Sequence, residues 1–207
     1  MDKKSLIIAI IAVLAIAGGT IRLIISQSDG SSKMNAKPFE YLGSVAGEET
    51  AKLLGNQGTV VAVVEVIEGM QNPANEAQIK GLKAGLAKSK GVTLKEVKEL
   101  KRDMSGDPRF WPEGRAAQLA GFGTGASAVV LFVNFPQALN PPDVAALKGS
   151  SAKLIAVTGA SPTLDALVNQ GVVRVAIANR VPPKPVASGK ETPAQWFERV
   201  YAVTKTP

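Results

Sequence analysis

The amino-acid sequence predicts an α/β fold, a flavodoxin-like doubly wound parallel sheet of about five strands, preceded by one N-terminal transmembrane helix. Three observations lead to this prediction. The 207-residue chain opens with a long apolar segment. Beyond it, apolar runs rich in Val and Ile alternate with stretches of helical periodicity, and turn-forming residues separate them. This alternation implies right-handed crossovers, and hence a parallel sheet with helices on both faces.

The apolar segment extends from Leu6 to Ile25 and contains a single charged residue, Arg22. About 20 such residues are enough to cross a hydrocarbon layer about 30 Å thick, and an arginine near the end can extend to the headgroups. We therefore expect residues 1–26 to anchor the protein in a lipid bilayer. Lys3 and Lys4 favour a cytoplasmic N-terminus and a domain on the periplasmic side of an inner membrane, although basic residues on the other flank weaken this orientation.

A cleaved signal peptide is the alternative to the anchor. Ala15 and Ala17, followed by Gly18, have the spacing of small residues at a cleavage site. The apolar run continues past this point and is longer than a typical signal-peptide core, which favours the anchor. Residues 27–38 are rich in Ser, Asn and Lys, so we expect a flexible linker there, followed by a single α/β domain over residues 39–207.

Within the domain, five segments are predicted to be strands and six to be helices. Near-continuous apolar runs such as TVVAVVEVI suit strands that are buried on both faces. The helical segments place apolar side chains every three or four residues. The expected strands cover residues 59–67, 92–100, 128–135, 153–158 and 172–178, and the expected helices cover residues 39–54, from about 75 onward, 113–120, 144–148, 162–169 and 194–203.

Three of these assignments depend on specific local signals. Thr93 and Glu96 have the spacing of a helix capping box, but the glycine before this segment favours the strand that we predict. Ser161 and Pro162 suit the N-cap and the first position of the helix that follows. The prolines after Arg180 cannot continue a sheet, so the chain is expected to close with an amphipathic helix packed against the domain.

The composition excludes several kinds of chemistry, because the chain contains no His and no Cys. Without them there can be no disulfide, no usual zinc ligand set, no axial His for haem, and no Ser-His or Cys-His catalytic pair. Asp103, Asp107, Glu113 and Asp143 are the carboxylates that could serve acid-base chemistry, and nothing in the sequence brings them together. We therefore expect a protein that is not an enzyme, with no cofactor and no metal.

The formal charge of +7 makes nucleic acid a partner to consider. Carboxylates are interleaved with the basic cluster, and no aromatic residue within it could stack on a base. A solvated charged face is the better interpretation, and nucleic acid is an unlikely partner. The cluster consists of Lys80, Lys83, Lys88, Lys90, Lys95, Lys98, Lys101 and Arg102.

Polar residues follow most of the predicted strands, where an open parallel sheet binds its ligands. Together these polar residues could line a binding cleft at the carboxyl ends of the strands. The competing interpretation is that they are ordinary turn and cap residues. The candidates at the strand ends are Glu68, Gln71 and Asn72, then Asn134 and Phe135, then Thr158 and Ser161, then Asn179 and Arg180.

Two further segments invite a functional interpretation. Trp111 lies in the aromatic loop Phe110-Trp111-Pro112, which could dock a partner, stack on a ligand, or simply cover the edge of the sheet. The segment GFGTG at residues 121–125 resembles a phosphate-binding loop, but it precedes a strand, whereas such a loop must follow a strand and open a helix. We therefore assign no phosphate site to it.

The sequence resembles one lobe of the type I periplasmic binding protein fold, in its sugar-binding and LacI-like group. The resemblance covers residues 58–180 and lies in patterns of strand and turn, with no invariant motif. It implies a small-molecule ligand held at the carboxyl ends of the strands. That family closes two lobes around its ligand, whereas this chain has length for one. The matching segments are GTVVAVVEVIEG, IKGLKAGLAKSKGV, ASAVVLFVNFP and KLIAVTGASPTLDALVNQGVVRVAIANR.

These observations leave three hypotheses of function. The first is a membrane-tethered, non-catalytic domain that acts as an accessory or scaffold subunit of a membrane or envelope complex, with a membrane protein as partner. The second is a domain that binds or senses a small, sugar-like molecule, as the resemblance implies. The third is an enzyme that relies on carboxylates or Lys, and the missing nucleophile-base pairs count against it.

Overall fold

The computed structural model of the chain describes residues 34–206 except 71, 103–105, 108 and 187–188. The predicted anchor from Leu6 to Ile25 lies outside these residues, so it stays a prediction, as does the linker before residue 34. No helix in the described part of the chain is long and apolar enough to cross a membrane. The residues from Ala36 onward form one compact unit.

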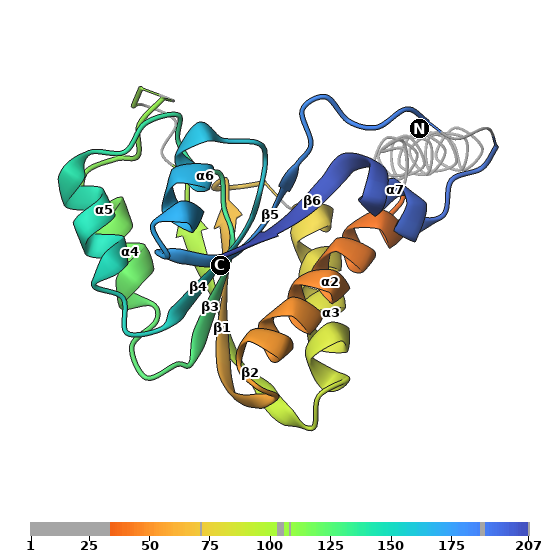
Figure 1. Cartoon of the computed structure of the whole chain (residues 1–207), viewed down its shortest axis with the longest axis horizontal. Helices are drawn as coiled ribbons and strands as arrows, with labels where there is room; N and C mark the ends of the chain where they lie inside the picture. Colours follow the sequence, from red (N-terminus) through yellow and green to blue (C-terminus); the bar gives the residue numbers. More distant parts are fainter. Residues whose placement is uncertain (1–33, 71, 103–105, 108, 187–188, 207) are drawn as a thin grey trace, which may run out of the picture. The chain divides into compact units, whose positions relative to one another are not determined.

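The domain is built on a six-stranded sheet with the strand order β2-β1-β3-β4-β5-β6. The first five strands of the chain pair in parallel, and β6 pairs with β5 in antiparallel orientation (Figure 1). The predicted parallel sheet of five strands is therefore confirmed, and a sixth strand was not predicted. The strands are β1 (Gln57–Val66), β2 (Gly91–Lys101), β3 (Ala128–Phe132), β4 (Lys153–Thr158), β5 (Val173–Asn179) and β6 (Tyr201–Lys205).

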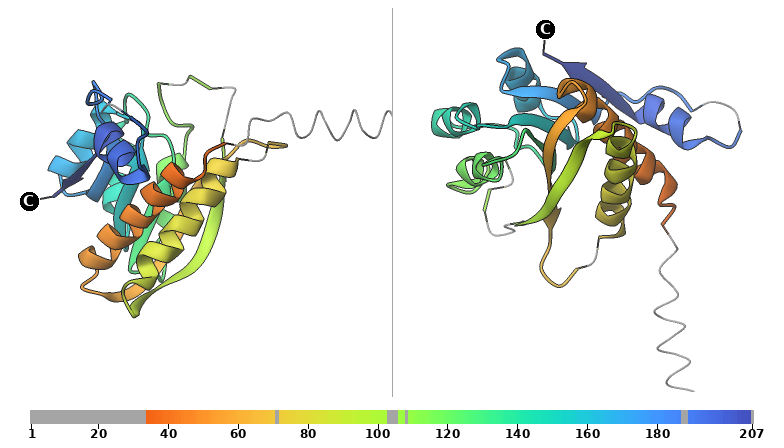
Figure 2. Two further views of the ribbon diagram at one scale, coloured as in Figure 1. Left: turned by 90° about the vertical axis from the view of Figure 1, so that its right-hand side faces the viewer. Right: turned by 90° about the horizontal axis from the view of Figure 1, so that it is seen from below.

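Helices cover both faces of the sheet, as the alternation of elements predicts (Figure 2). One face packs against α2, α3 and α7, and the other packs against α4, α5 and α6. Successive side chains of β1 point to opposite faces of the sheet. Val60 and Ala62 pack on the side of α2 and α3, while Val61 and Val63 pack on the side of α4, α5 and α6. The helices are α2 (Lys37–Leu53), α3 (Pro73–Ala87), α4 (Arg115–Gly121), α5 (Pro141–Lys148), α6 (Pro162–Asn169) and α7 (Pro193–Val200).

The last helix is shorter than predicted, because α7 ends at Val200 and the chain then becomes a strand. The backbone of Tyr201 is already extended, with φ −115° and ψ 155°. From Tyr201 to Lys205 the chain pairs with β5, whose outer edge would otherwise leave its N–H and C=O groups without partners. Hydrogen bonding to a distant strand therefore overrides the helical period at this point.

Four glycines allow α2 and α3 to pack closely side by side. A Cβ atom on Gly43 would overlap the main-chain oxygen of Gln78, and a Cβ on Gly81 would overlap that of Glu40. The backbones of the two helices are thus in direct contact. The remaining glycines of this contact are Gly47 and Gly85.

Two predicted capping signals have different outcomes in the structure. Thr93 and Glu96 lie within β2, so the predicted strand is confirmed and the capping-box spacing is coincidental. Ser161 does occupy the N-cap position of α6, but its hydroxyl forms no capping bond with the helix. It donates a hydrogen bond to the main-chain oxygen of Pro136 instead, at 2.8 Å, and so ties two loops at the carboxyl end of the sheet.

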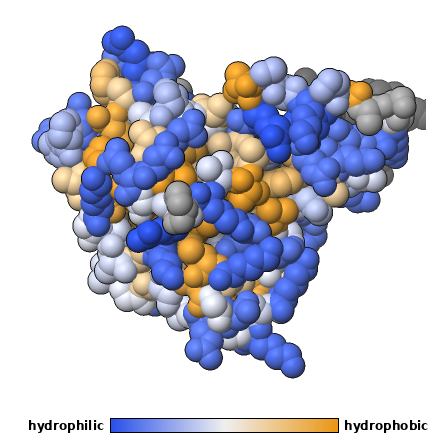
Figure 3. All heavy atoms as spheres, in the orientation of Figure 1, coloured by the Kyte–Doolittle hydropathy of each residue, from blue (hydrophilic) through white to orange (hydrophobic). Residues whose placement is uncertain are grey.

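The surface shown in Figure 3 carries both hydrophilic and apolar side chains. Apolar side chains appear in separate patches across the middle of this face, and hydrophilic side chains border them. Large apolar side chains that are exposed, such as Tyr41, Met70, Val97 and Val203, come from different elements of the domain.

Glu49 of α2 joins the C-terminal strand to the first helix of the domain. Its carboxylate lies 2.8 Å from Lys52 Nζ and 2.5 Å from Lys205 Nζ. Burial acts to raise the pKa of Glu49, but hydrogen bonds and charge from Lys205 and Lys52 outweigh it and hold the pKa below its usual value. A carboxylate with a lowered pKa stabilises the fold above its unfolded-state pKa and loses that contribution as the pH falls through the folded-state pKa.

We expect Glu49→Gln to lower the free energy of unfolding by about 1 kcal/mol near neutral pH, a modest value because both lysines are largely exposed. Urea denaturation of both proteins between about pH 7 and about pH 3 measures the effect. The difference should shrink toward zero as Glu49 becomes protonated in the wild-type protein. Glu76→Gln, at an exposed carboxylate without an ion pair among the described residues, is the control. A difference that stays constant across the pH range would contradict the assignment.

Candidate functional site

A pocket of about 450 Å³ lies at the carboxyl ends of β1, β3 and β4, on the side of the sheet covered by α2 and α3. The strand order reverses at this place, since the chain runs outward from β1 to β2 and then returns to β3 on the other side of β1. In open α/β sheets the crevice at such a reversal is where ligands bind. The pocket also falls within the usual volume range of small-molecule sites, about 300–1,000 Å³.

A hydrogen bond between Glu65 and Asn134 spans this point of reversal. Glu65 lies near the end of β1, and its Oε2 accepts a hydrogen bond from Asn134 Nδ2 at 2.8 Å, while Asn134 follows β3. The main-chain oxygen of Glu65 accepts another, from Asn75 Nδ2 of α3, also at 2.8 Å. These two bonds fix the ends of both strands and the first turn of α3 relative to one another. They place one carboxylate and two amides against the pocket.

Some of the other polar side chains in the pocket form hydrogen bonds within the protein, and others do not. Asn72 caps α3, with its Oδ1 accepting from the Ala74 N–H at 3.1 Å, and Thr158 Oγ1 accepts from the Phe135 N–H at 3.4 Å. The side chains of Gln78 and Arg102 line the pocket as well. Neither forms a hydrogen bond or ion pair with another described residue, so both are available to a ligand.

Apolar side chains form the remaining wall of the pocket, from Leu42 of α2, Phe132 of β3 and Val157 of β4, together with Tyr201 at the start of β6. The ring of Tyr201 is stacked on that of Phe197, with 5.7 Å between the ring centroids. Burial raises the pKa of Tyr201 above its usual value, so its phenol stays protonated at neutral pH. A protonated phenol can both donate and accept a hydrogen bond.

A second pocket, of about 320 Å³, adjoins the first on the α4 side of the sheet. The two pockets share Glu65, Arg102 and Asn134, so the Glu65–Asn134 pair stands between them. Trp111 closes the second pocket: its Nε1–H donates to the main-chain oxygen of Asn134 at 3.0 Å, and its ring centroid lies 5.0 Å from that of Phe135. The two pockets thus form one cleft across the carboxyl end of the sheet.

The loop before Trp111 is held by an ion pair. Arg109 Nη2 lies 2.7 Å from an oxygen of Asp107, and this guanidinium lowers the pKa of Asp107 to about 2. Arg109 also lies over the ring of Phe110, with 5.8 Å from Cζ to the ring centroid. Among the described residues, no group of three or more His, Cys, Asp and Glu side chains could hold a metal ion.

Five of the predicted site residues come together in this cleft. Asn72, Asn134 and Thr158 line the first pocket. Trp111 and Phe135 line the second pocket, which Asn134 also borders. The indole of Trp111 covers the end of β3 and also lines the second pocket, while partner docking and stacking on a ligand stay predictions.

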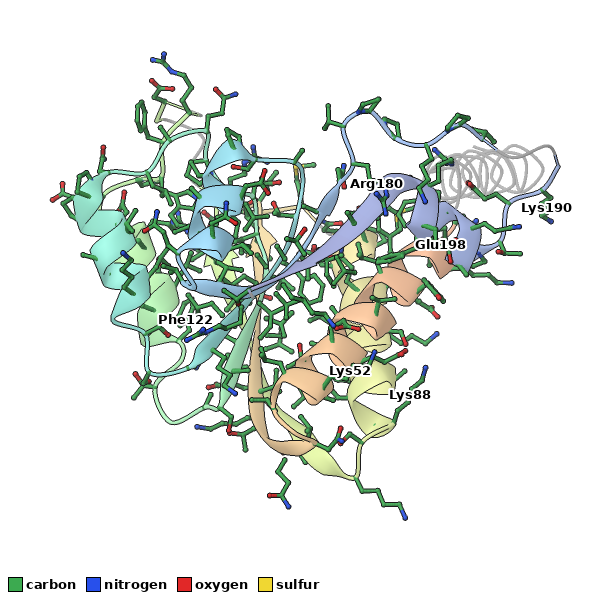
Figure 4. The ribbon with its side chains drawn as sticks, in the orientation of Figure 1. Lys52, Lys88, Phe122, Arg180, Lys190 and Glu198 are labelled. Atoms are coloured by element: carbon green, nitrogen blue, oxygen red, sulfur yellow. The ribbon has the colours of Figure 1, made fainter. Side chains whose placement is uncertain are left out.

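Other predicted residues that the structure describes do not line the cleft. Glu68 is exposed and pairs with a lysine of β2. Asn179 and Arg180 lie at the end of β5, two strands away from β3, and Arg180 Nε donates to the main-chain oxygen of Glu198 on α7 at 3.1 Å (Figure 4). These two residues support the junction with β6 and are not part of either pocket. Gln71 lies outside the described residues.

Several residues that line the first pocket were not among the site residues predicted from the sequence. Glu65 is the one charged residue in the apolar run 59–67, and a lone carboxylate in a buried strand was the signal that could have identified it. Arg102 was counted with the basic cluster, and Tyr201 was assigned to a helix. Nothing in the sequence marked Gln78 as a site residue, because a glutamine on a helix usually lies on the protein surface.

Half of the basic cluster of the sequence is matched by carboxylates. Four lysines on α3, just after it and on β2 pair with acidic side chains at distances of 2.6 to 3.2 Å. These pairs reduce the net positive field that a nucleic acid would need. The pairs are Lys80–Glu40, Lys88–Glu48, Lys98–Glu96 and Lys101–Glu68.

No family model matches the sequence, and no curated protein matches it. One similar solved structure is a solute-binding protein of an ABC transporter from Burkholderia graminis in complex with D-arabinose. The two sequences are 18% identical, the TM-score is 0.49, and the match covers 67% of this chain and 46% of that one. An ABC transporter solute-binding protein from Bacillus halodurans with bound myo-inositol has 19% identity, TM-score 0.48 and coverage of 67% and 46%.

An arabinose-binding protein from Geobacillus stearothermophilus has 18% identity, TM-score 0.47 and coverage of 68% and 45%. This chain therefore spans less than half the length of each of these three proteins. Two of these three structures are described as solute-binding proteins of ABC transporters, and the third as an arabinose-binding protein.

Proposed function

We propose that the domain binds a small, neutral, polyhydroxylated molecule of the sugar class in the pocket at the carboxyl ends of β1, β3 and β4. The observation that carries the proposal is the Glu65–Asn134 hydrogen bond, which lies at the reversal of strand order in a pocket of about 450 Å³. It holds a carboxylate and an amide in a fixed position beside an open space. Preorganised polar groups of this kind give a site its specificity.

The chemistry of the lining favours hydroxyl groups as the ligand's polar atoms. Carboxylate and amide oxygens accept hydrogen bonds, while the Gln78 amide, the Arg102 guanidinium and the Tyr201 phenol donate them. Each hydroxyl of a sugar both donates and accepts, so it suits a mixed set better than an acceptor-only anion does. Among the residues that the structure describes, the charged ones that line this pocket are Glu65 and Arg102, and their charges cancel. A ligand of zero net charge fits that balance.

The apolar wall suits the other surface of such a ligand. The C–H groups of a sugar ring form an apolar face, and Leu42, Phe132, Val157 and the Tyr201 ring present apolar atoms to the same space. We expect this wall to hold the ring while the amides and charged groups select the arrangement of hydroxyls.

The hypothesis of a membrane-tethered scaffold subunit draws on the predicted anchor, which lies outside the described residues. We keep attachment to the inner membrane, with the domain on the periplasmic side, as a proposal from the sequence. No specific observation in the described part of the chain favours a scaffold role over ligand binding, so ligand binding is the proposed function. No catalytic role is proposed.

A thermal-shift screen of the full-length protein in detergent tests ligand binding. The probes are pentoses, hexoses and cyclic polyols, each at millimolar concentration. A ligand present at about 100 times its Kd adds about 2.7 kcal/mol to the free energy of unfolding, which corresponds to a rise of roughly 5–10 °C in Tm for a domain of this size. If none of these compounds raises the Tm, the proposed ligand class is wrong.

A matched pair of variants locates the site of any ligand found. Asn134→Ala removes an amide that lines the pocket and leaves Glu65 without the bond that fixes its carboxylate, and we expect it to weaken binding by at least about tenfold, because the ligand loses both a hydrogen-bonding partner and the fixed position of a second. Asn179→Ala removes an exposed amide at the end of β5, outside the pocket, and should leave the Kd unchanged. Titration calorimetry measures both. Equal affinities in the two variants would place the ligand elsewhere.

A further inference from the structure

The strand β2 forms one edge of the sheet, and β1 is its one neighbour among the described residues (Figure 2). It is 11 residues long, and the part from Glu96 to Lys101 follows β1 in unbroken register. Such an edge presents a row of N–H and C=O groups that can pair with another strand. An edge of this length is either protected against pairing or used for it.

The charges of β2 are self-complementary around Val97. The sequence Lys95, Glu96, Val97, Lys98, Glu99 has opposite charges at equal distances on the two sides of the valine. In an antiparallel pair of identical strands related by a two-fold axis through Val97, Glu96 of each copy lies opposite Lys98 of the other, and the two Val97 side chains meet. Opposite charges in directly opposed positions stabilise a strand pair, and like charges destabilise it.

The neighbouring registers lack this match. A two-fold axis through Glu96 or Glu99 sets two glutamates opposite each other, and an axis through Lys98 sets two lysines opposite each other. Protective charges on edge strands commonly work through repulsion of this kind. The register irregularity of β2 precedes Glu96, so the match between Glu96 and Lys98 lies in the regular part of the strand.

Val97 supplies an apolar centre for the same pairing. Its side chain is 39% exposed, although it lies in the middle of a strand. It borders a groove of about 610 Å³ between α3 and β2, whose apolar lining includes Val64, Val66 and Ile79. Pairing through Val97 would bring the grooves of two copies together and cover their apolar walls.

We propose that two copies of this chain associate through antiparallel pairing of their β2 strands, with the two-fold axis at Val97. The sheet then continues across the interface from one copy to the other. Because the axis closes the contact upon itself, the product is a dimer and does not grow into a filament. The carboxyl-end cleft contains no residue of the pairing segment 96–98, so dimerisation is separate from ligand binding.

Disulfide cross-linking tests the position of the axis, and the absence of Cys from the chain makes the result specific. In full-length Val97→Cys, the two Cβ atoms that carry the new thiols lie opposite each other across the axis, about 4.5–5.5 Å apart as is typical of opposed residues. A disulfide needs about 3.5–4.5 Å between these atoms, so a small local movement of the strands allows the bond to form. We expect most of the protein to become a disulfide-linked dimer under mild oxidation. Val203→Cys, on the other edge strand and 37% exposed in the wild type, is the matched control and should stay monomeric. Equal cross-linking of the two variants would overturn the proposal.

Charge exchange tests the register. In the Val97→Cys background, Lys98→Glu replaces two attractive pairs with two repulsive ones, and we expect the rate of cross-linking to fall by about tenfold. Adding Glu96→Lys restores opposite charges with their signs exchanged, so the rate should return to within about twofold of the parent. The register would be wrong if Lys98→Glu cross-linked as fast as the parent, or if the double exchange failed to restore the rate.

Discussion

Gly81→Ala is expected to lower the free energy of unfolding of the domain by about 2–3 kcal/mol, although alanine is normally the better residue in a helix. In the middle of α3, an added methyl group would overlap the main-chain oxygen of Glu40 and approach the amide nitrogen of Ser44. Both atoms belong to the backbone of α2, so no side chain can turn away to make room. Relief requires the helices to separate, and overpacking of this kind typically costs about 1–3 kcal/mol.

The control for this variant is Gly121→Ala, at the end of α4. An added Cβ there meets no atom within 4 Å, so the usual gain of roughly 0.5–1 kcal/mol from replacing a helical glycine should appear, reduced by the terminal position. Urea denaturation of both variants measures the free energies. Opposite signs for the two substitutions support the close packing of α2 on α3, whereas a stabilising effect at Gly81 would show that the helices are further apart.

Phe197→Ala is expected to cost about 3–5 kcal/mol, the range for removing a buried phenylalanine. Phe197 is 8% exposed and belongs to the cluster between the sheet, α2 and α7. Its ring centroid lies 5.8 Å from that of Tyr41 on α2 and 5.7 Å from that of Tyr201 on β6. The substitution therefore opens a cavity where the first helix of the domain and the last strand meet.

Phe110→Ala is the matched aromatic control, because Phe110 is 40% exposed. Its removal should change the free energy of unfolding by no more than about 0.5 kcal/mol, as for most surface substitutions. Thermal and urea denaturation measure both variants. A loss below about 1 kcal/mol for Phe197→Ala would mean that α7 and β6 contribute little to the stability of the domain.

The parallel part of the sheet could be predicted because its signals are local. The strands β1, β3, β4 and β5 are short apolar runs with turn residues on both sides, and burial on both faces follows from that composition, whereas β2 was assigned from the glycine before it. The sixth strand could not be found in this way. Trp196, Phe197, Val200 and Tyr201 continue one helical period, and the change to a strand depends on the edge of β5, which is remote in the sequence.

The site was predicted in part for a related reason. Polar residues after strands are visible in the sequence, and those after β3 and β4 do line the cleft. Which strand ends lie side by side depends on strand order, which the succession of elements does not determine. Asn179 and Arg180 were included because they follow a strand, yet the reversal of strand order lies between β1 and β3. Glu65 was omitted because it is inside a strand.

The antiparallel strand β6 also has a consequence for the timing of assembly. Tyr201 is the residue with which this strand begins, and it forms part of the pocket wall. On the ribosome, strands β1, β3 and β4 emerge well before it, so the pocket stays open on one side until Tyr201 has been added and β6 has paired. A compound that needs the tyrosine ring can therefore bind only to chains that already contain β6.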